Sequence, residues 1–317
     1  YLGYMRRAQF GAQLSARNSA EGHHRLLLLL LRYSTDNGAF YYYNTVEGKD
    51  YEATMLDIAS YAKAEGIPYK YWLADSWWYY KDPDGPNGGG VTNWTARPDV
   101  FPHGLEYVYE QTGWAVQGHN RFWSNRTTYA KENGGDYAFL LDAGGYALPA
   151  EQRFWDDLLL SSRVKWGLAV YEQDWLDQEF DNFPPLTTNA TLARTWLAQM
   201  ATGAARAGLT VQYCMSHCRH VLASAEFPSV TQARASGDYH PGGDQWHPVG
   251  TTSLFAYALG LAPSKDNYWS TTDQPGAKHT AFRRSTLSSS SRAATLRRLY
   301  TPASYTKGRP LVCVSAA

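Results

Sequence analysis

The sequence lacks an excess of charge of either sign. Its 317 residues include 29 Lys and Arg and 29 Asp and Glu, so the formal net charge is zero. A surface that binds nucleic acid or an anionic membrane needs a local excess of Lys and Arg. We therefore expect no nucleic-acid partner for this chain, and no anionic membrane as its target.

Long apolar runs are also missing. The run Leu26–Leu31 is six residues long and lies between Arg25 and Arg32, whereas spanning a bilayer takes roughly 20 apolar residues. The run is typical of a buried strand or a helical turn, and we predict no membrane span. The chain begins at Tyr1 without an initiator Met or a signal peptide, so we interpret it as a processed or partial product.

Several motifs that carry other chemistries are absent. No Gly-x-Ser-x-Gly nucleophile elbow occurs, and the glycine run 88–90 lacks the Lys and Ser or Thr of a phosphate-binding loop. Cys214, His217, Cys218 and His220 form no standard zinc spacing, and no second pair of ligands accompanies them. We therefore predict neither a metal site nor a cofactor.

The few cysteines leave the redox compartment open, and the sequons give a better indication of it. Cys214 and Cys218 are spaced by about a helical turn, which suits a disulfide or two free thiols, and Cys313 is left over. Three Asn-x-Thr sequons lie in stretches that we interpret as loops, and together they indicate a glycoprotein that is secreted or resides in the secretory pathway. Their acceptors are Asn93, Asn125 and Asn189.

Aromatic residues, in contrast, are abundant. They make up 15% of the chain, with 12 Trp and 24 Tyr. Most of them are expected to pack helices against strands, but the excess also suits a protein that stacks rings on the apolar faces of sugars. The partner that we predict is therefore an oligosaccharide or another glycoside.

From about residue 40 to residue 260, short apolar or aromatic runs alternate with amphipathic segments, as in βα units around a parallel sheet. Six such units without a separate compositional block predict a (β/α)8 TIM-type barrel that is incomplete or irregular in its C-terminal units. We divide the chain into a leading segment (1–39), the barrel domain (40–272) and a Ser- and Arg-rich tail (273–317) that stays irregular or completes the barrel. The expected strands are 40–43, 67–74, 114–118, 167–172, 209–213 and 229–235, and the expected helices are 51–64, 105–111, 150–160, 192–207, 220–225 and 253–261.

The strand ends carry a set of acids, cations and aromatic rings. In a βα barrel the carboxyl ends of the strands converge on one face, where active sites lie. Acids there suit glycosidic chemistry, and rings and cations suit sugar binding, although each residue alone is also explained by packing, a helix cap or an ion pair. The candidates for binding substrate are Asp75, Trp77, Trp78, His119, Arg121, Trp123, Glu172, Trp175, His217 and Arg234.

Two aspartates are the candidates for catalysis. Glycosyl transfer through an oxocarbenium-like transition state needs one carboxylate to attack the anomeric carbon and one carboxylic acid to protonate the leaving oxygen. Asp174 directly follows an apolar strand, which suits a fixed nucleophile. Asp238 lies in a turn four residues after Arg234, which suits an acid/base.

The segments 212–217 (QYCMSH) and 231–239 (TQARASGDY) resemble raffinose synthases and their α-galactosidase relatives, the clan-D glycoside hydrolases. The resemblance extends over about residues 65 to 270. It implies a (β/α)8 barrel with a nucleophilic Asp after the fourth strand, which matches Asp174. It also implies an acid/base in an Arg-x-x-x-Asp turn after the sixth strand, which matches Arg234 and Asp238.

Two positions depart from that family pattern. The chain has Asp75-Ser76 where relatives that bind galactose carry two adjacent acids, and Glu172 where they carry Lys. Glu172 is either a ligand of a hydroxyl pair or a cationic sugar substituent, or a structural acid. The function that we expect is a retaining glycoside hydrolase acting on an α-linked glycoside. The alternatives are a raffinose-synthase-like glycosyltransferring enzyme and a non-catalytic carbohydrate-binding or structural glycoprotein on the same barrel.

Overall fold

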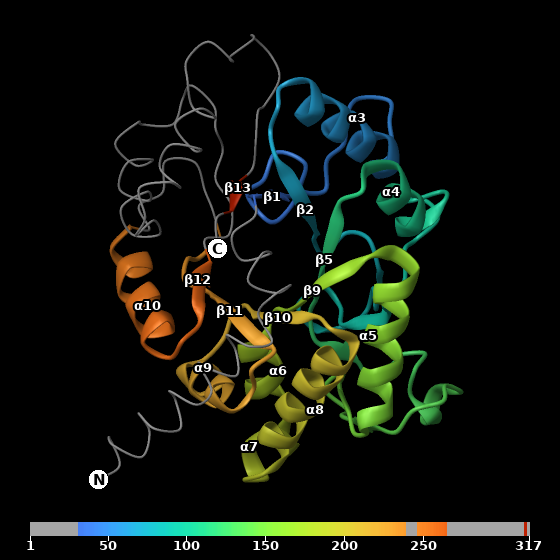
Figure 1. Cartoon of the computed structure of the whole chain (residues 1–317). Helices are drawn as coiled ribbons and strands as arrows, with labels where there is room; N and C mark the ends of the chain where they lie inside the picture. Colours follow the sequence, from blue (N-terminus) through green and yellow to red (C-terminus); the bar gives the residue numbers. More distant parts are fainter. Residues whose placement is uncertain (1–30, 239–245, 265–313, 316–317) are drawn as a thin grey trace.

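The computed structural model describes residues 31–238, 246–264 and 314–315. Its main feature is a curled sheet in which seven parallel strands are neighbours in chain order (Figure 1). An eighth strand, β13 (Val314–Ser315), pairs antiparallel with β1. The arrangement is an incomplete βα barrel, as predicted. The parallel strands are β1 (Leu31–Ser34), β2 (Tyr69–Ala74), β5 (Ala115–Asn120), β9 (Leu168–Gln173), β10 (Thr210–Tyr213), β11 (Val230–Arg234) and β12 (Ala262–Ser264).

Helices connect these strands and cover the outer face of the sheet. The predicted helices 51–64 and 192–207 are confirmed to the residue. The first begins where the Asp50 carboxylate accepts a hydrogen bond from the backbone of Ala53 at 2.7 Å, and the second ends at Gly208, which has φ +67°. The helices are α3 (Tyr51–Ala64), α4 (Gly104–Thr112), α5 (Gln152–Trp166), α6 (Leu176–Asn182), α7 (Pro184–Thr188), α8 (Leu192–Ala207), α9 (Cys218–Ala223) and α10 (Trp246–Ala258), with 3-10 turns at Pro86–Gly88, Lys131–Asn133 and Ser224–Glu226.

The first strand lies nearer the N-terminus than predicted. Residues 40–43 form turns and bends, and the strand is Leu31–Ser34. The aromatic run 40–43 has the composition of a strand. Tyr43, however, is 54% exposed and adopts φ +47°, a left-handed backbone conformation that lies outside the β region. The strand β12 was also missed, because three residues after the helix α10 give too short a pattern to recognise. The tail 273–317 lies outside the described residues apart from β13.

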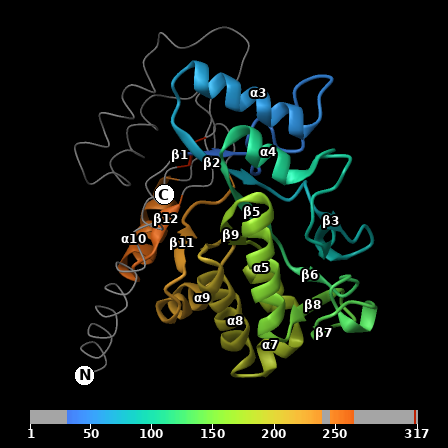
Figure 2. The same cartoon turned by 45° about the vertical axis from the view of Figure 1, so that its right-hand side comes forward.

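Two excursions from the barrel, predicted as loops, form a second sheet. One excursion lies between β2 and α4 and the other between β5 and α5, and their strands pair in the order β3-β4-β6-β8-β7. Figure 2 shows this sheet beside the β5 side of the barrel, away from β11 and β12. Asn93 is the last residue of β4 and so is not in a loop. The strands are β3 (Tyr80–Lys81), β4 (Val91–Asn93), β6 (Trp123–Ser124), β7 (Phe139–Leu141) and β8 (Tyr146–Pro149).

The outer helices pack tightly where a glycine allows it. Gly203 of α8 lies against α5, and a Cβ on Gly203 would come within 2.8 Å of Trp155 Cβ and 2.9 Å of the Trp155 backbone carbon. Trp155 is fully buried. Within the described ranges, no helix is both long enough and apolar enough to cross a membrane.

We expect Gly203→Ala to destabilise the protein by about 1–3 kcal/mol, because the methyl group would meet backbone and Cβ atoms that cannot rotate away. This cost outweighs the gain in helix propensity of up to about 1 kcal/mol. Thr202→Ala, at the neighbouring partly exposed position, is the control and should change stability little. Urea unfolding measures both variants, and an unchanged or raised stability of Gly203→Ala would contradict this packing.

Candidate active site

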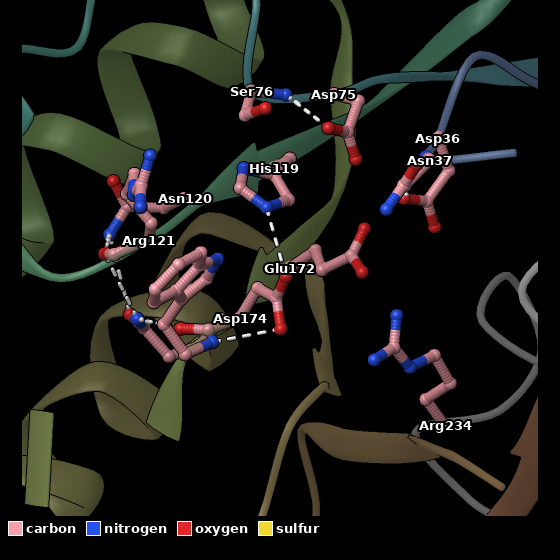
Figure 3. Close-up of polar contacts among 12 residues, drawn as sticks. Asp36, Asn37, Asp75, Ser76, His119, Asn120, Arg121, Glu172, Asp174 and Arg234 are labelled. Carbon is pink, nitrogen blue, oxygen red and sulfur yellow. Dashed lines mark hydrogen bonds and ion pairs between the residues drawn. The ribbon is translucent and has the colours of Figure 1, made fainter. Parts of the chain in front are cut away.

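Figure 3 shows candidate residues from several strands close together, among them Asp75, His119, Glu172, Asp174 and Arg234. Asp75 directly follows β2, His119 is the fifth residue of β5, and Asp174 directly follows β9. Because β2, β5 and β9 are neighbours in the sheet and His119 pairs with Glu172, these side chains lie at one end of the barrel. The sequence prediction that they share a site is consistent with this placement.

Asp174 is a buried carboxylate with several hydrogen-bond donors. Its Oδ2 lies 3.1 Å from Nε2 of His119, its Oδ1 accepts the backbone N–H of Trp175 at 2.8 Å, and it is 7% exposed. Burial would raise the pKa of Asp174, but the hydrogen bonds from His119 and the Cys214 thiol and the positive charge of Arg234 together lower it to about 2. Asp174 is therefore ionised across the physiological pH range.

His119 is engaged on both sides of its ring. Its Nδ1 lies 2.9 Å from the hydroxyl of Tyr79, and the two rings are parallel within 9°. His119 is 2% exposed. We had expected His119 to donate to a sugar hydroxyl, but both ring nitrogens contact protein groups, so the structure places it behind Asp174 instead.

Asp238 is held between two loops. Arg234 Nη1 donates to its Oδ1 at 2.9 Å, and Asn37 Nδ2 donates to its Oδ2 at 2.7 Å. Asn37 follows β1, so this contact crosses the sheet from strand one to strand six. Since the charge of Arg234 also acts on Asp174, both aspartates lie in the field of the same guanidinium group.

Asp75 differs from Asp174 in its proton affinity. Its carboxyl group is 3% exposed, and this burial, with the negative charges of Glu172 and Asp174, raises its pKa to about 7, while hydrogen bonds from the Ser76 backbone and Asp36 act in the opposite direction. Asp36 and Asn37 were not among the candidates from sequence. They directly follow β1, and the misplacement of that strand hid them.

Glu172 belongs to a buried polar network in the barrel interior. Gln117 donates to its Oε2 at 2.7 Å and Gln212 donates to its Oε1 at 3.2 Å, while Arg32 donates to Gln117 at 2.7 Å. Glu172 is 1% exposed, and burial raises its pKa, an effect that the charge of Arg32 and the hydrogen bond from Gln117 partly offset. Both of its oxygens are occupied, which supports the interpretation as a structural acid.

Three of the four candidate tryptophans are packing residues. Trp77 stacks on Tyr51 with ring centroids 3.5 Å apart, Trp78 donates its indole N–H to the Ala74 carbonyl, and Trp123 packs edge-on against Phe154. Each is at most 2% exposed. This burial corrects the expectation that Trp77, Trp78 and Trp123 stack on substrate.

Trp175 remains a candidate for stacking, and Arg121 supports it. The Arg121 guanidinium carbon lies 4.0 Å from the centre of the Trp175 ring, and its Nη2 donates to the Asn87 carbonyl. Arg121 is 5% exposed, whereas Trp175 is partly exposed. The cation–π contact covers one face of the indole, so Arg121 orients Trp175 and does not itself reach outward.

His217 and the cysteines lie around the ends of β10 and α9. His217 Nε2 lies 3.0 Å from both carboxylate oxygens of Asp181, so at the rim it contacts a protein group in place of the predicted substrate. Cys214 is a buried thiol and Cys218 an exposed one, and no disulfide joins them, which argues against the disulfide alternative. Cys313 lies outside the described residues. In those residues, no three His, Cys, Asp or Glu side chains are grouped to hold a metal ion.

Backbone strain also gathers near the site. Within the described ranges, the non-glycine residues with positive φ are Tyr43, Asn87, Trp175 and Met215. Tyr43 follows β1, Trp175 follows β9 and Met215 follows β10. Strained conformations of this kind persist where the surroundings fix them, and they cluster at functional sites. The strain at Trp175 sets the direction in which the chain leaves Asp174.

Glu179 is a further buried acid that the sequence analysis did not single out. It lies on α6, five residues after Asp174, and is fully buried. Burial raises its pKa well above the usual value, which the backbone N–H of Trp123 offsets only in part. Burial therefore favours the protonated form of Glu179 on α6. Its sequence signal was only a helical spacing from Leu176.

Comparison with known proteins does not identify a family for this chain. No family model and no curated protein matches the chain. Among solved structures, a xylosidase from Aspergillus niger has 12% identity and a TM-score of 0.44, with 69% of this chain and 36% of the xylosidase covered. A GH31 dextranase from Flavobacterium johnsoniae, complexed with glucose, has 11% identity and a TM-score of 0.43, with 71% and 30% covered.

A third structure, an α-amylase from Malbranchea cinnamomea, has 10% identity and a TM-score of 0.42, with 72% of this chain and 56% of the amylase covered. The chain thus spans about a third of the length of the xylosidase and of the dextranase. These neighbours are glycoside hydrolases. Similarity at this level concerns the arrangement of the chain alone, so the assignment of activity rests on the site.

The raised pKa of Asp75 predicts a pH dependence of stability. Its pKa is 3.8 in an unperturbed chain and about 7 in the fold, so between these values the folded state binds more protons than the unfolded state. The contribution of Asp75 to the free energy of unfolding therefore falls as pH rises from about 4 to about 7, by at most about 1.4 kcal/mol per pH unit. Asp75→Asn should remove this slope.

Denaturant unfolding at several pH values across that window measures the effect. The control is Asp57→Asn, which removes an acid from an exposed ion pair with Lys49 on α3 and should keep the wild-type slope. An Asp75→Asn protein with the same slope as the control would show that Asp75 is not the titrating group.

Proposed function

We propose that this protein is a retaining glycoside hydrolase that acts on an α-linked glycoside, with Asp174 as nucleophile and Asp238 as acid/base. The observation that carries the proposal is the state of Asp174. It is buried at the end of β9 and still ionised, because His119, Cys214 and Arg234 offset the cost of burial. A desolvated carboxylate fixed at a strand end is suited to attack an electrophilic carbon.

The reaction would follow a double displacement. Asp174 attacks the anomeric carbon and forms a glycosyl ester, while Asp238 gives its proton to the leaving glycosidic oxygen. Asp238 then removes a proton from water, whose oxygen attacks the same carbon and releases Asp174. Each Asp238 oxygen accepts one hydrogen bond, from Arg234 or from Asn37, and keeps a second lone pair that can carry the proton.

The same two aspartates would also serve glycosyl transfer to a sugar acceptor, as in raffinose synthases. Hydrolysis and transfer differ only in whether water or a second sugar takes the glycosyl unit from Asp174. A non-catalytic glycan-binding protein would not need the buried donors that keep Asp174 ionised. The proposed substrate remains an α-linked glycoside, with Trp175 as the ring that stacks on a sugar.

We expect Asp174→Asn to lower kcat on an activated aryl α-glycoside by at least about 1000-fold, since an amide cannot form the glycosyl ester. The melting temperature should change little, because the amide can keep the hydrogen bond at Oδ1. Activity assays on a panel of aryl α-glycosides, followed by labelling with a 2-deoxy-2-fluoro glycosyl fluoride and mass spectrometry, test the role directly.

The control for this experiment is Asp157→Asn, which changes an exposed ion pair with Arg153 on α5 and should keep full activity and labelling. The fluorosugar adduct should map to Asp174 in the wild-type protein and disappear in Asp174→Asn. Full activity of Asp174→Asn, or an adduct on another residue, would refute the assignment.

We also propose that the protein passes through the secretory pathway and carries a glycan at Asn189. Asn189 is exposed, and its Oδ1 accepts hydrogen bonds from Thr191 and Leu192, which turns the amide nitrogen outward. Asn125, in contrast, donates its amide nitrogen to the Asp142 carbonyl at 2.9 Å. Asn93 is the last residue of β4 and is only partly exposed, whereas Asn189 is exposed.

Expression through a eukaryotic secretory pathway should therefore give a protein that loses one glycan mass on treatment with peptide N-glycosidase. Asn189→Gln should abolish that shift, whereas Asn125→Gln, the matched sequon control, should preserve it. Secretion without any shift, or a shift that survives Asn189→Gln, would contradict the assignment of the glycan to Asn189.

A further inference from the structure

We infer that Tyr79 is a positioning residue, which holds His119 in the tautomer that donates from Nε2 and thereby fixes the carboxylate of Asp174 for attack. The inference concerns a linear chain of contacts, Tyr79–His119–Asp174. It rests on the proposed function only for the claim that Asp174 reacts. The state of His119 is a separate property of the fold and can be measured without a substrate.

The three residues come from neighbouring parts of the sheet. Tyr79 lies just after β2, His119 lies in β5, and Asp174 directly follows β9. The Tyr79 oxygen is 2.9 Å from Nδ1 of His119, and Nε2 is 3.1 Å from Oδ2 of Asp174. The exposed fractions of Tyr79, His119 and Asp174 are 0%, 2% and 7%, so bulk water does not compete for these contacts.

The proton positions follow from the acceptor at the end of the chain. An ionised carboxylate only accepts hydrogen bonds, so Nε2 of His119 must donate to Asp174. A neutral imidazole has one N–H, so its Nδ1 must then accept. Burial raises the pKa of Tyr79 well above the usual value, so the phenol keeps its proton and supplies the donor that Nδ1 requires.

An imidazolium would break this pattern. Its Nδ1–H would point at the Tyr79 oxygen, and the phenol proton would then need a different acceptor in a fully buried position, which costs free energy. In the neutral Nε2–H tautomer, each of the two contacts has one donor and one acceptor. Asp174 and Tyr79 therefore act together: the carboxylate accepts from Nε2, and the phenol, by donating to Nδ1, disfavours a second proton on the ring.

The rest of the surroundings hold the ring in place. The Tyr79 and His119 rings are parallel within 9°, and the Trp94 indole donates to the His119 carbonyl at 2.9 Å. The other oxygen of Asp174 accepts the Trp175 backbone N–H at 2.8 Å. His119 and Trp175 thus hold one carboxylate oxygen each, and this fixes the plane of the carboxylate. Loss of either donor would leave the group free to rotate.

The first variant is Tyr79→Phe, which keeps the buried ring and removes the donor. We expect kcat on the aryl α-glycoside to fall about 10- to 100-fold, the range typical of residues that orient a reactive group through another side chain, while KM changes less than about 3-fold. The control Tyr129→Phe removes a partly buried hydroxyl that contacts Trp94 and Asn93 at the end of β4, and it should change kcat little.

The second variant pair tests the direction of the hydrogen bond. The amide nitrogen of Gln reaches about as far as Nε2 of a histidine, so His119→Gln can still donate to Asp174. His119→Leu cannot donate at all. We expect His119→Gln to recover at least about 10-fold of the kcat lost in His119→Leu. Equal activity of the two would show that His119 acts only by filling space.

The third measurement uses the full chain with ¹⁵N-labelled histidine and does not depend on activity. NMR of the ring nitrogens near neutral pH should show His119 protonated at Nε2 alone, with the resonance identified by its loss in His119→Gln. In Tyr79→Phe the phenol proton no longer opposes a proton on Nδ1, so we expect a ring protonated at both nitrogens to appear beside this tautomer, whereas Tyr129→Phe should leave the tautomer unchanged.

The outcomes separate the two claims. A wild-type protein that shows the Nε2–H tautomer alone, with the doubly protonated ring appearing in Tyr79→Phe, supports the inference even if no glycoside is turned over, and only the proposed function then fails. A wild-type His119 protonated at Nδ1 overturns the inference even in an active glycosidase. So does a Tyr79→Phe variant with wild-type kcat and an unchanged tautomer.

Discussion

The site depends on one costly condition, an ionised carboxylate that is almost completely removed from water. An uncompensated buried charge is among the most destabilising features that a fold can contain. Here the compensation for Asp174 comes from three different parts of the chain, namely His119 on β5, Arg234 at the end of β11 and the Cys214 thiol after β10. The barrel must therefore bring strands three to six together before Asp174 can exist in this state.

The layer below Asp174 obeys a second constraint. The interior of a βα barrel is usually filled by branched apolar side chains, whereas this interior holds Arg32, Gln117, Glu172 and Gln212 in one hydrogen-bonded network. Half-satisfied polar networks in a core are unfavourable, so each amide must keep its orientation. The network thereby fixes the register of β1, β5, β9 and β10 relative to one another, and it does so directly under the site.

Much of the fold could be predicted from sequence, and the errors have physical causes. The helices 51–64 and 192–207 carry long 3.6-residue periodicities and clear caps, so their limits were predicted correctly. The strand at 40–43 was predicted from aromatic composition alone, and composition cannot distinguish a strand from aromatic turns at the barrel mouth. The second sheet was missed because two- to four-residue strands leave no periodic signal.

The site could be predicted only in part, for a related reason. Strand-end positions indicated that Asp75, His119 and Asp174 lie together, because that placement follows from the topology of parallel strands. Which face of a ring is exposed depends on packing with distant residues, and so Trp77, Trp78 and Trp123 were misassigned. Asn37 could not be found at all, because its role depends on a contact with Asp238, 201 residues away.

The acid at position 172 is balanced by a positive charge from another strand. Glu172 is a buried acid two residues before Asp174, and burial raises its pKa. In this chain the buried Arg32 on β1 acts electrostatically on Glu172 and reaches it through Gln117. A positive charge thus comes from β1, in the interior below Asp174. A sugar held above Asp174 would therefore meet no lysine from β9, and selection among sugars would fall to Asp75 and to the loop that carries Asp36 and Asn37.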